Sequence, residues 1–418
     1  MGSSHRRIVV TGAGCLSSLA DSPAGLHAAL CAGASGLKPI ELFATESIGC
    51  HQAGEIRPFD PQSYLGERNL RPIDRTSRLL LVAAGQALAA GGWPAASAEE
   101  MAQREVGLVL GTTFCSVRTI AEFDRRALQL GPSYASPLDF ANSVINAAAG
   151  QTAIWYGLRG LNSTVSAGEA SGLAAIAYAA DQIRGGRAAA LLAGGAEELC
   201  FESFFGHHQA GRLCGSNPRN GNGEFPVPFD ARRNGFALAE GAALLMLEDE
   251  EAAAERGVPA LACVLGHGTG FDPWRTEEGA VRAVARAVRL ALEDAGLRPQ
   301  DVDVLSTGAN GSVEGDRWEA AGVAQALGTR AADLPVTAVK SMLGEALGAS
   351  GGLQAVALLG TFGDGVLPGI LGLEATEDGF PLPGARPETR RAGARRGLIT
   401  ALSADGQAVA VVLGAAGG

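Results

Sequence analysis

Apolar positions along the chain predict two similar helix-then-strand units. The stretch Leu79 to Ala90 has the spacing of a buried helix and ends at Gly91-Gly92, after which Val106 to Leu110 has the apolar pattern of a strand. A second helix is predicted from an apolar stripe with charged residues on the opposite face: Val281, Val284, Val288 and Leu292 against Arg282, Arg286, Arg289 and Glu293. That helix is expected to end at Gly296, before a strand at Val302 to Leu305.

Each unit also offers a strand, a Gly-Glu-Ala turn and a helix that is apolar on every face. The first helix follows Gly168-Glu169-Ala170, and the second lies between Gly344 and Leu359. We therefore interpret the chain as two copies of one α/β half, residues 1–255 and 256–418. Gly12-Ala13-Gly14 is expected to be a tight strand-to-helix turn rather than a nucleotide loop, because no third glycine follows at the needed spacing.

Composition narrows the class of protein. A hydrophobic content of 47% with 18% charged residues indicates a large core, and a net charge of -11 argues against nucleic acid as a partner. Seven cysteines without a C-x-x-C pair indicate reduced thiols and no metal site. Met1 to Arg6 lacks an apolar signal region, and no run of eighteen uncharged apolar residues occurs, so we expect a cytoplasmic protein without a membrane span.

Several ordered blocks give the chain a family resemblance. They are Val9-Val10-Thr11-Gly12-Ala13-Gly14, Pro228 to Phe236 followed by Glu240-Gly241-Ala242, and Lys340-Ser341-Met342-Leu343-Gly344. With these blocks the chain resembles the β-ketoacyl-[acyl carrier protein] synthases of the thiolase superfamily. The resemblance implies a thiolase-like α/β fold with duplicated halves in five layers, α-β-α-β-α, and no cofactor.

The resemblance also implies three catalytic residues, and none is present. Glu169 stands where the family pattern A-C-A-S-G has its cysteine, Gly308 stands for the first histidine, and Glu345 for the second, which follows Lys340. All six histidines lie elsewhere in the sequence: His5, His27, His51, His207, His208 and His267. The family's G-F-G-G-x-N loop appears as Ser403-Ala404-Asp405-Gly406-Gln407-Ala408, which puts the second oxyanion donor in doubt. Condensation by this chain alone is not expected, because glutamate cannot replace a thiolate as acyl acceptor.

Two hypotheses are open for Glu169. In the first, it is an inert residue paired with Lys340, which the family places close to the active site. In the second, Glu169 and Glu345 form a carboxylate pair in a dry pocket, which would raise one pKa and suit acid/base chemistry on a carrier-bound acyl chain. Asn310 and Phe236 are further pocket candidates, while Ser171, Asp316 and Glu319 are most simply structural.

An extra stretch distinguishes the first half from the second. It includes Phe114 to Leu130, Ser136 to Phe140 and Asn146 to Gly150, and the matching family region builds the dimer interface and lines the neighbouring subunit's acyl channel. Candidates for the tunnel are Phe114, Val117, Ile120 and Phe123; the alternative for the last three is plain core. Trp155 and Tyr156, within Val144 to Gly160, are candidate interface anchors.

A ketosynthase-like chain without its catalytic set looks most like a chain-length factor. The resemblance then implies a heterodimer with an active ketosynthase in a type II polyketide system, acting on chains bound to acyl carrier protein. The best-known factors carry glutamine where Glu169 stands, and the Lys340 block favours a polyene or reduced-chain system. A homodimeric acyl-binding protein is a further alternative. The arginines at 386, 390, 391, 395 and 396 form either a carrier-protein patch or a solvated loop.

Overall fold

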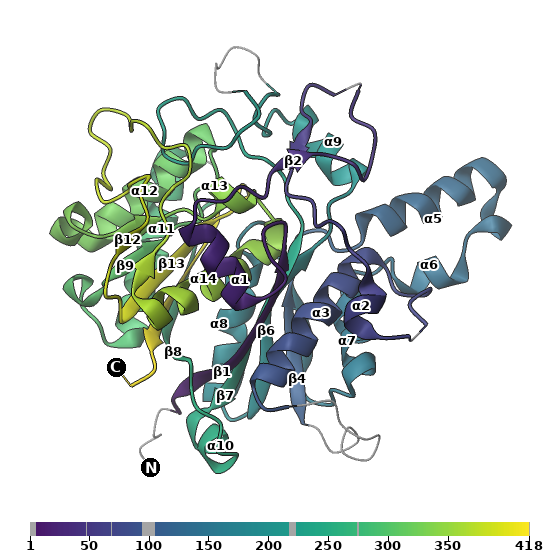
Figure 1. Cartoon of the computed structure of the whole chain (residues 1–418), viewed down its shortest axis with the longest axis horizontal. Helices are drawn as coiled ribbons and strands as arrows, with labels where there is room; N and C mark the ends of the chain where they lie inside the picture. The colour runs from purple at the N-terminus through teal and green to yellow at the C-terminus, as the bar shows by residue number, and fades with distance from the viewer. Residues whose placement is uncertain are drawn as a thin grey trace.

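One large mixed sheet organises the molecule (Figure 1). The computed structural model describes residues 6–46, 48–67, 69–93, 105–216, 223–273 and 276–417. Within these residues the sheet has ten strands in the order β10-β9-β13-β14-β8-β1-β7-β6-β4-β5. The strands of the first half are β1 (Ile8–Ser17), β4 (Val106–Gly111), β5 (Asn162–Val165), β6 (Ala190–Glu197) and β7 (Gly241–Asp249). Those of the second are β8 (Ala262–Phe271), β9 (Val304–Ser306), β10 (Val336–Thr337), β13 (Arg396–Leu402) and β14 (Gln407–Ala415).

The same strand order occurs in both halves. Read from the outer edge inward, β5-β4-β6-β7-β1 repeats as β10-β9-β13-β14-β8. The halves join where Ile8, Val9 and Val10 of β1 pair antiparallel with Val264, Cys263 and Ala262 of β8. This duplicated α/β architecture confirms the predicted fold class, while the boundary between residues 255 and 256 stays a prediction.

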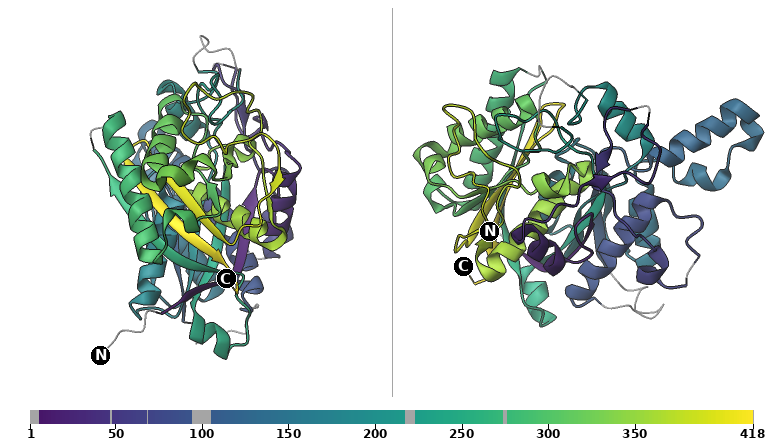
Figure 2. Two further views of the ribbon diagram at one scale, coloured as in Figure 1. Left: turned by 90° about the vertical axis from the view of Figure 1, so that its left-hand side faces the viewer. Right: turned by 45° about the horizontal axis from the view of Figure 1, so that its top comes forward.

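Helices cover the sheet on both faces (Figures 1 and 2). The helices of the first half are α1 (Pro23–Cys31), α2 (Pro61–Leu65), α3 (Arg75–Ala90), α5 (Val117–Leu130), α6 (Pro137–Ala141), α7 (Ala147–Tyr156), α8 (Ser171–Arg184), α9 (Phe201–Gln209) and α10 (Glu250–Glu255). Those of the second are α11 (Glu277–Ala295), α12 (Val313–Leu327), α13 (Lys340–Leu343) and α14 (Ser350–Asp364), and two small ribbons, β2 (Lys38–Pro39) with β3 (Gln52–Ala53) and β11 (Val366–Leu367) with β12 (Arg390–Arg391), complete the described elements.

The two central helices, α8 and α14, pack against each other inside the main apolar core. Helix α3 covers the outer face of the first half, and α11 with α12 covers that of the second. Because both faces are covered, β4, β6 and β7 are buried along their whole lengths, which explains their continuous apolar sequences.

Several local predictions are confirmed and one is wrong. Helix α3, strand β4 and helix α11 lie where the patterns predicted them, and α11 ends at Gly296 in a left-handed conformation. Gly12-Ala13-Gly14, in contrast, lies inside strand β1 and forms no turn. A Cβ atom on Gly12 would lie 2.3 Å from the carbonyl oxygen of Ala87, so glycine is needed there because α3 packs tightly on the strand.

Helices α5 and α6 project from the body of the protein as an arm (Figure 1). We call residues 117–141 the arm. No residue of α5 or α6 is buried in this chain, although α5 is strongly amphipathic. The alternative that Val117, Ile120 and Phe123 are plain core of this chain is therefore wrong.

A search of the described helices finds none with the length and apolarity needed to cross a membrane. Residues 1–5, which include His5, lie outside the described residues. The predictions about a leader at Met1–Arg6 and about His5 therefore stay predictions.

The close approach of α8 and α14 gives a stability prediction. A Cβ atom on Gly351 would lie 2.5 Å from the backbone nitrogen of Leu173 in α8, which the two helices can relieve only by moving apart. We expect Gly351→Ala to lower the free energy of unfolding by about 2 kcal/mol or more. The measurement is urea unfolding followed by circular dichroism.

Gly363→Ala is the matched control in the same helix. A Cβ atom there meets nothing within 4 Å, so the change should be neutral or stabilise the protein by up to about 1 kcal/mol. Equal effects of the two substitutions would contradict the proposed helix contact.

Candidate functional site

Glu169 lies in the turn between β5 and α8 and is only 5% exposed. The turn depends on a left-handed Gly168, whose φ is 56°. The hydroxyl of Ser171 accepts a hydrogen bond from the Ala167 N–H at 2.8 Å and donates to the Gly168 carbonyl at 2.6 Å. Ser171 therefore shapes the turn that carries the glutamate.

The Glu169 carboxylate is held by groups from two distant segments. Its Oε1 accepts a hydrogen bond from the Arg212 guanidinium, while its Oε2 accepts from the Ser403 hydroxyl at 2.7 Å and from the Ala404 N–H at 3.1 Å. Burial alone would raise the pKa of Glu169, but the charge of Arg212 and the hydrogen bond from Ser403 lower it to about 2. Glu169 is therefore ionised, and both of its carboxylate oxygens accept hydrogen bonds.

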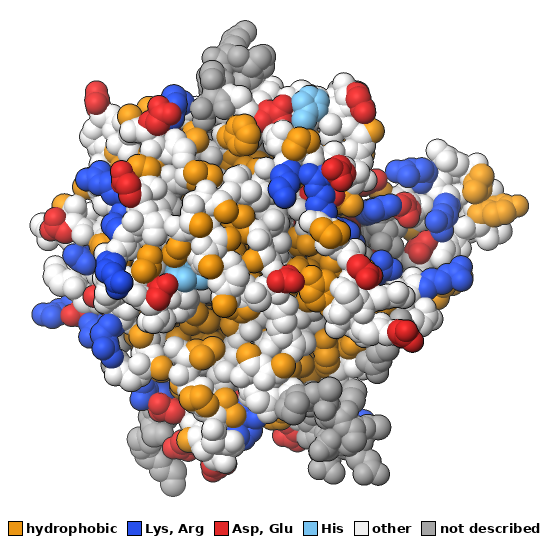
Figure 3. Space-filling model, viewed as in Figure 1, with side chains coloured by type: hydrophobic (Ala, Val, Ile, Leu, Met, Phe, Trp, Pro, Cys, Tyr) orange, Lys and Arg blue, Asp and Glu red, His pale blue; other side chains and the backbone are white. Residues whose placement is uncertain are grey.

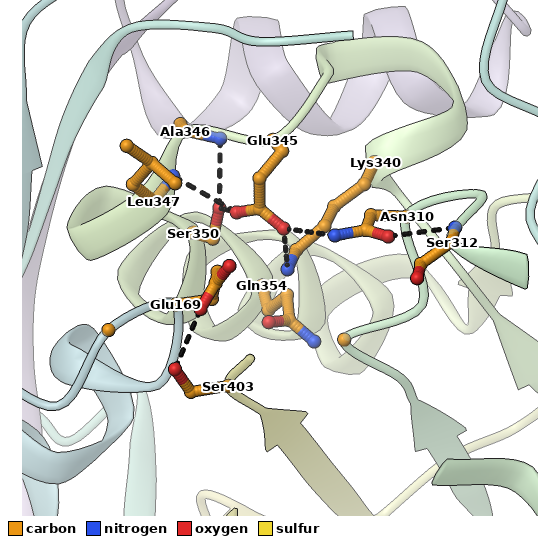
Figure 4. Close-up of polar contacts among 12 residues, drawn as sticks. Glu169, Asn310, Ser312, Lys340, Glu345, Ala346, Leu347, Ser350, Gln354 and Ser403 are labelled. Atoms are coloured by element: carbon orange, nitrogen blue, oxygen red, sulfur yellow. Dashed lines mark hydrogen bonds and ion pairs between the residues drawn. The ribbon is translucent and has the colours of Figure 1, made fainter. Parts of the chain in front are cut away.

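Glu345 has a separate set of partners (Figure 4). Its Oε2 accepts hydrogen bonds from the Lys340 ammonium at 2.7 Å and from the Asn310 side-chain amide at 2.8 Å. Its Oε1 accepts from the Ser350 hydroxyl at 2.6 Å and from the Leu347 N–H at 3.0 Å. Lys340 and Glu345 are both buried, so they form an ion pair inside the protein.

These contacts correct two expectations about the glutamates. The predicted pairing of Glu169 with Lys340 is wrong, because Lys340 is bound to Glu345 and Glu169 is bound to Arg212. A pair that shares a proton is also wrong for Glu169, because its pKa is lowered rather than raised. Each carboxylate is bound to its own cation, so the two glutamates do not form a pair with each other.

The position of the first missing histidine is tightly enclosed. The Gly308 N–H donates to Glu319 Oε1 at 2.8 Å, and a Cβ atom on Gly308 would lie 3.0 Å from the Ala401 Cα and 3.1 Å from the Thr400 oxygen. A histidine at this position would require the neighbouring strand to shift. The space beside Gly308 is therefore filled by the neighbouring strand and Glu319.

Two buried carboxylates hold the loop that follows Gly308. Asp316 accepts hydrogen bonds from the backbone N–H groups of Asn310, Gly311 and Phe229, and burial raises its pKa to about 6. Burial also raises the pKa of Glu319 to about 7, against the lowering effect of the Thr400 hydroxyl and Gly308 N–H. Both residues act as structural supports of the loop.

A cavity of about 290 Å³ opens beside this network. Glu169, Arg212, Asn310 and Ser403 are among the residues that line it. Phe236 is buried behind Arg212, whose guanidinium lies 5.3 Å from the centre of the ring. The walls at the inner end are therefore charged and polar.

Arg212 is the residue that the sequence did not reveal. It lies 43 residues from Glu169 in a segment without periodicity, and only the folded chain brings the two together. The one available signal was general: a buried carboxylate needs a cation, but the chain has 33 lysines and arginines.

The tunnel candidates lie at the base of the arm. Phe114 is 43% exposed, with its ring centre 6.1 Å from that of His207, while Val117, Ile120 and Phe123 are half-buried. Their roles toward another subunit stay predictions.

The interface candidates lie on α7. Tyr156 donates a hydrogen bond from its hydroxyl to the Leu81 carbonyl at 2.8 Å, and both Trp155 and Tyr156 pack against the apolar cluster of Leu81. Ile154, at 79% exposed, is the large apolar side chain of α7 that faces away from the body. The interface role of Trp155 and Tyr156 stays a prediction.

The five C-terminal arginines do not form one free patch. Arg390, Arg395 and Arg396 donate to backbone carbonyls of Gly384, Gly417 and Asp301 in their own chain. Arg386, Arg391 and Arg395 are the exposed members, while Arg390 and Arg396 are partly buried. Within the described part of the chain, no group of three or more histidine, cysteine or acidic side chains is placed to hold a metal ion.

Comparisons with known proteins agree with this geometry. The family model "Beta-ketoacyl synthase, N-terminal domain" matches residues 5–253, and "Beta-ketoacyl synthase, C-terminal domain" matches residues 261–374. The chain is 31% identical over 385 residues to 3-oxoacyl-[acyl-carrier-protein] synthase 2 of Vibrio cholerae, which covers 90% of this chain and 91% of the relative. Nodulation protein E of Rhizobium leguminosarum bv. trifolii is 33% identical over 367 residues, covering 87% and 88%. Among solved structures, the ishigamide ketosynthase/chain length factor superposes with a TM-score of 0.90 at 28% identity, covering 99% of this chain and 100% of that one.

The site predicts how stability depends on pH. The folded-state pKa of Glu169 is below its unfolded value, so its contribution is present above about pH 4.5 and is lost as pH falls toward about 2. The lowered pKa corresponds to about 3 kcal/mol. Glu319 and Asp316 have raised pKa values of about 7 and 6, so they become protonated in the folded state first and favour folding as pH falls from 8 to 5.

We therefore expect maximum stability near pH 5, measured by urea unfolding between pH 2.5 and 8. Glu169→Gln should make the acid side of the profile less steep, and Glu319→Gln should reduce the rise between pH 8 and 5, to which Asp316, Glu197 and Glu198 also contribute because burial raises their pKa values to about 6, 7 and 8. An acid side that is as steep in Glu169→Gln as in the unmodified protein would contradict the assignment.

Proposed function

Because the chain belongs to the β-ketoacyl synthase family, we propose that it is a non-elongating, chain-length-factor-like subunit that pairs with an active ketosynthase of a type II polyketide system. In the proposed heterodimer the active subunit forms carbon-carbon bonds on chains bound to acyl carrier protein. This chain bounds the tunnel in which the chain grows.

The state of Glu169 is the observation that carries the proposal. Acyl transfer in this family resembles attack by a thiolate, whereas Glu169 is a carboxylate with a pKa of about 2, bound to Arg212 and Ser403. Gly308 has no side chain to donate a hydrogen bond, and Glu345 is held by Lys340. The geometry therefore supports a role in shaping the complex rather than in condensation.

The exposed apolar surface of the arm supports a protein partner (Figure 3). Large apolar side chains that are about half exposed or more continue from the arm to the start of α7: Leu128, Leu130, Tyr134, Leu138, Phe140 and Val144. Several exposed large apolar side chains on one projecting segment are typical of an interface, and Figure 3 shows charged side chains among them on this face.

The sheet edge formed by β5 also supports a protein interface on this side of the molecule. In the described chain β5 pairs with β4 on one side and ends the sheet on the other, whereas the opposite edge strand, β10, is met by Ala385 through a bridge at Val336. Edge strands left open are natural sites for pairing with another chain. We propose that α7 and β5 form the centre of the heterodimer interface.

The solved relative adds support. It is a ketosynthase/chain length factor, and its match extends over nearly the whole of both chains. The Lys340-Ser341-Met342-Leu343-Gly344 block favours a polyene or reduced-chain product over an aromatic one.

The alternatives have less support. The acid/base alternative relies on Glu169, whose pKa is lowered to about 2. Glu319 has a pKa raised to about 7, but it is buried and its Oε1 is bound by the Gly308 N–H and the Thr400 hydroxyl, which favours a structural role.

A homodimeric acyl-binding protein needs an apolar pocket, whereas the cavity beside Glu169 mixes apolar residues such as Trp318 and Leu402 with Glu169, Arg212 and Asp272. A larger, mainly apolar pocket between α1 and α14 lies away from this site.

Association with a ketosynthase is the first test of the proposed function. Mixed with a ketosynthase that has its intact cysteine and two histidines, the chain should form a one-to-one complex in size-exclusion chromatography with light scattering. Ile154→Asp should weaken the complex at least tenfold, because it places a charge in the proposed interface. Leu261→Asp, at a 46% exposed position preceding β8, should leave association unchanged.

The same samples test activity. Malonyl carrier protein should lose carbon dioxide in the presence of the pair and not with this chain alone. Steady release by the single chain, or a homodimer that refuses exchange with the ketosynthase, would contradict the proposal.

Product length is the second test. Alanine substitutions at Phe114, Val117, Ile120 and Phe123 remove bulk from the base of the arm, so at least one should lengthen the carrier-bound products, read by mass spectrometry. Because these side chains are not fully buried, each change should cost less than the about 3 to 5 kcal/mol of a core phenylalanine.

Asp124→Ala is the matched control on the same helix, since Asp124 is exposed and does not belong to the apolar surface of the arm. Its product profile should match that of the unmodified chain. Unchanged length in all four variants, with the complex intact, would mean that the tunnel is bounded elsewhere.

A further inference from the structure

The donors around Glu169 form a complete anion-binding site. A guanidinium, a hydroxyl and a backbone N–H, from Arg212, Ser403 and Ala404, meet at one carboxylate, and the N–H of Glu169 itself also stabilises the charge. These donors come from three separate parts of the chain: Arg212, the pair Ser403-Ala404, and Glu169 itself. The start of helix α8 follows directly, so its positive dipole end faces the same charge.

The donors of the site also have contacts that do not involve the glutamate side chain. Ser403 is 4% exposed. A Cβ atom placed on Gly168 would lie only 1.9 Å from the Ser403 Oγ, so the hydroxyl packs directly against the turn. Arg212 stacks on the buried Phe236 ring and also contacts Nδ1 of His207 at 3.4 Å. The donors are therefore held by contacts other than those with Glu169.

The site is also accessible from solvent. Glu169, Arg212, Ser403 and Ala404 all line the cavity of about 290 Å³, and the Arg212 side chain is 32% exposed. A small anion could enter by this path if the glutamate side chain were absent.

We propose that Glu169 is an internal plug: its carboxylate occupies a carboxylate-binding site that the chain otherwise presents to the cavity. While it is bound, no small carboxylate or carboxyl-bearing acyl group can use the same donors. Removal of the side chain exposes a site for a small monocarboxylate such as acetate. This inference concerns the single chain and is independent of any partner subunit.

The identity of the ligand follows from the donor geometry. Arg212 addresses one oxygen of the Glu169 carboxylate, while Ser403 and Ala404 address the other, which suits a planar two-oxygen anion better than a spherical one. Acetate reproduces the carboxylate with one methyl group. Chloride at the same ionic strength is the test of whether shape matters.

The experiment measures binding of acetate to Glu169→Ala by isothermal titration calorimetry and by the shift in melting temperature, with sodium chloride as the matched salt. We expect Glu169→Ala to bind acetate at least tenfold more tightly than the unmodified chain or Glu169→Gln, whose side chain still fills the site. Glu169→Ala with Arg212→Met should lose that binding at least tenfold. Acetate should raise the melting temperature of Glu169→Ala and not that of the double variant.

A second carboxylate-arginine pair provides the control. Glu202 pairs with Arg125 at 3.3 Å near the surface, without converging hydroxyl and backbone donors, so Glu202→Ala should gain no acetate binding. If Glu169→Ala is too unstable to purify, Glu169→Ser provides the same cavity with one hydroxyl and is tested in the same way. Folded Glu169→Ala or Glu169→Ser that binds acetate no better than Glu202→Ala would overturn the proposal.

Discussion

The contact between α8 and α14 is the constraint on which the rest of the site depends. A Cβ atom on Gly351 would lie 2.5 Å from the Leu173 nitrogen of α8, and one on Gly172 would lie 2.6 Å from the Gly348 oxygen just before α14 and 3.1 Å from the Gly352 nitrogen within it, so both glycines permit the close approach. Each helix is preceded by a Gly-Glu-Ala turn, so this contact brings Glu169 and Glu345 into one region from the two halves. Leu173 of α8 and Leu353 of α14 belong to the same core cluster, so the two turns are carried by helices that share one packed core.

Two buried carboxylates in one region would be costly unless each were neutralised. Taking an ion from water costs several kcal/mol, and a partner compensates only when the hydrogen bonds are also complete. Both glutamates meet this condition, Glu345 through Lys340, Asn310 and Ser350, and Glu169 through Arg212 and Ser403. A third glutamate, Glu197, accepts hydrogen bonds from Thr113 and Gly348, so it joins the β4 turn of one half to the α14 turn of the other.

The sequence was sufficient for the architecture because apolar periodicity and ordered blocks report which faces are buried. The sequence was not sufficient where the partner of a side chain comes from a distant part of the chain. The family resemblance predicts Lys340 as the partner of Glu169. The actual partner, Arg212, comes from a segment whose position no local sequence pattern indicates. The sequence predicts a turn at Gly12 because glycine is common in turns. Glycine also occurs where two backbones approach closely, and only the packing of α3 on β1 shows that this second reason applies at Gly12. Helix α5 has the stripe of a core helix, but α6 and α9 cover its apolar face only in part and none of its residues is buried, which periodicity alone does not reveal.

The two ion pairs differ in how far apart their members lie along the chain. Lys340 and Glu345 are separated by 5 residues, whereas Arg212 and Glu169 are separated by 43. The first pair moves as a unit with its own turn and survives any fluctuation that leaves α13 and the start of α14 intact. The second is broken whenever the segment that carries Arg212 opens locally, even if the sheet stays folded. Amide hydrogen exchange in the two Gly-Glu-Ala turns would therefore be governed by different events, so two turns of the same sequence in one duplicated fold have different lifetimes.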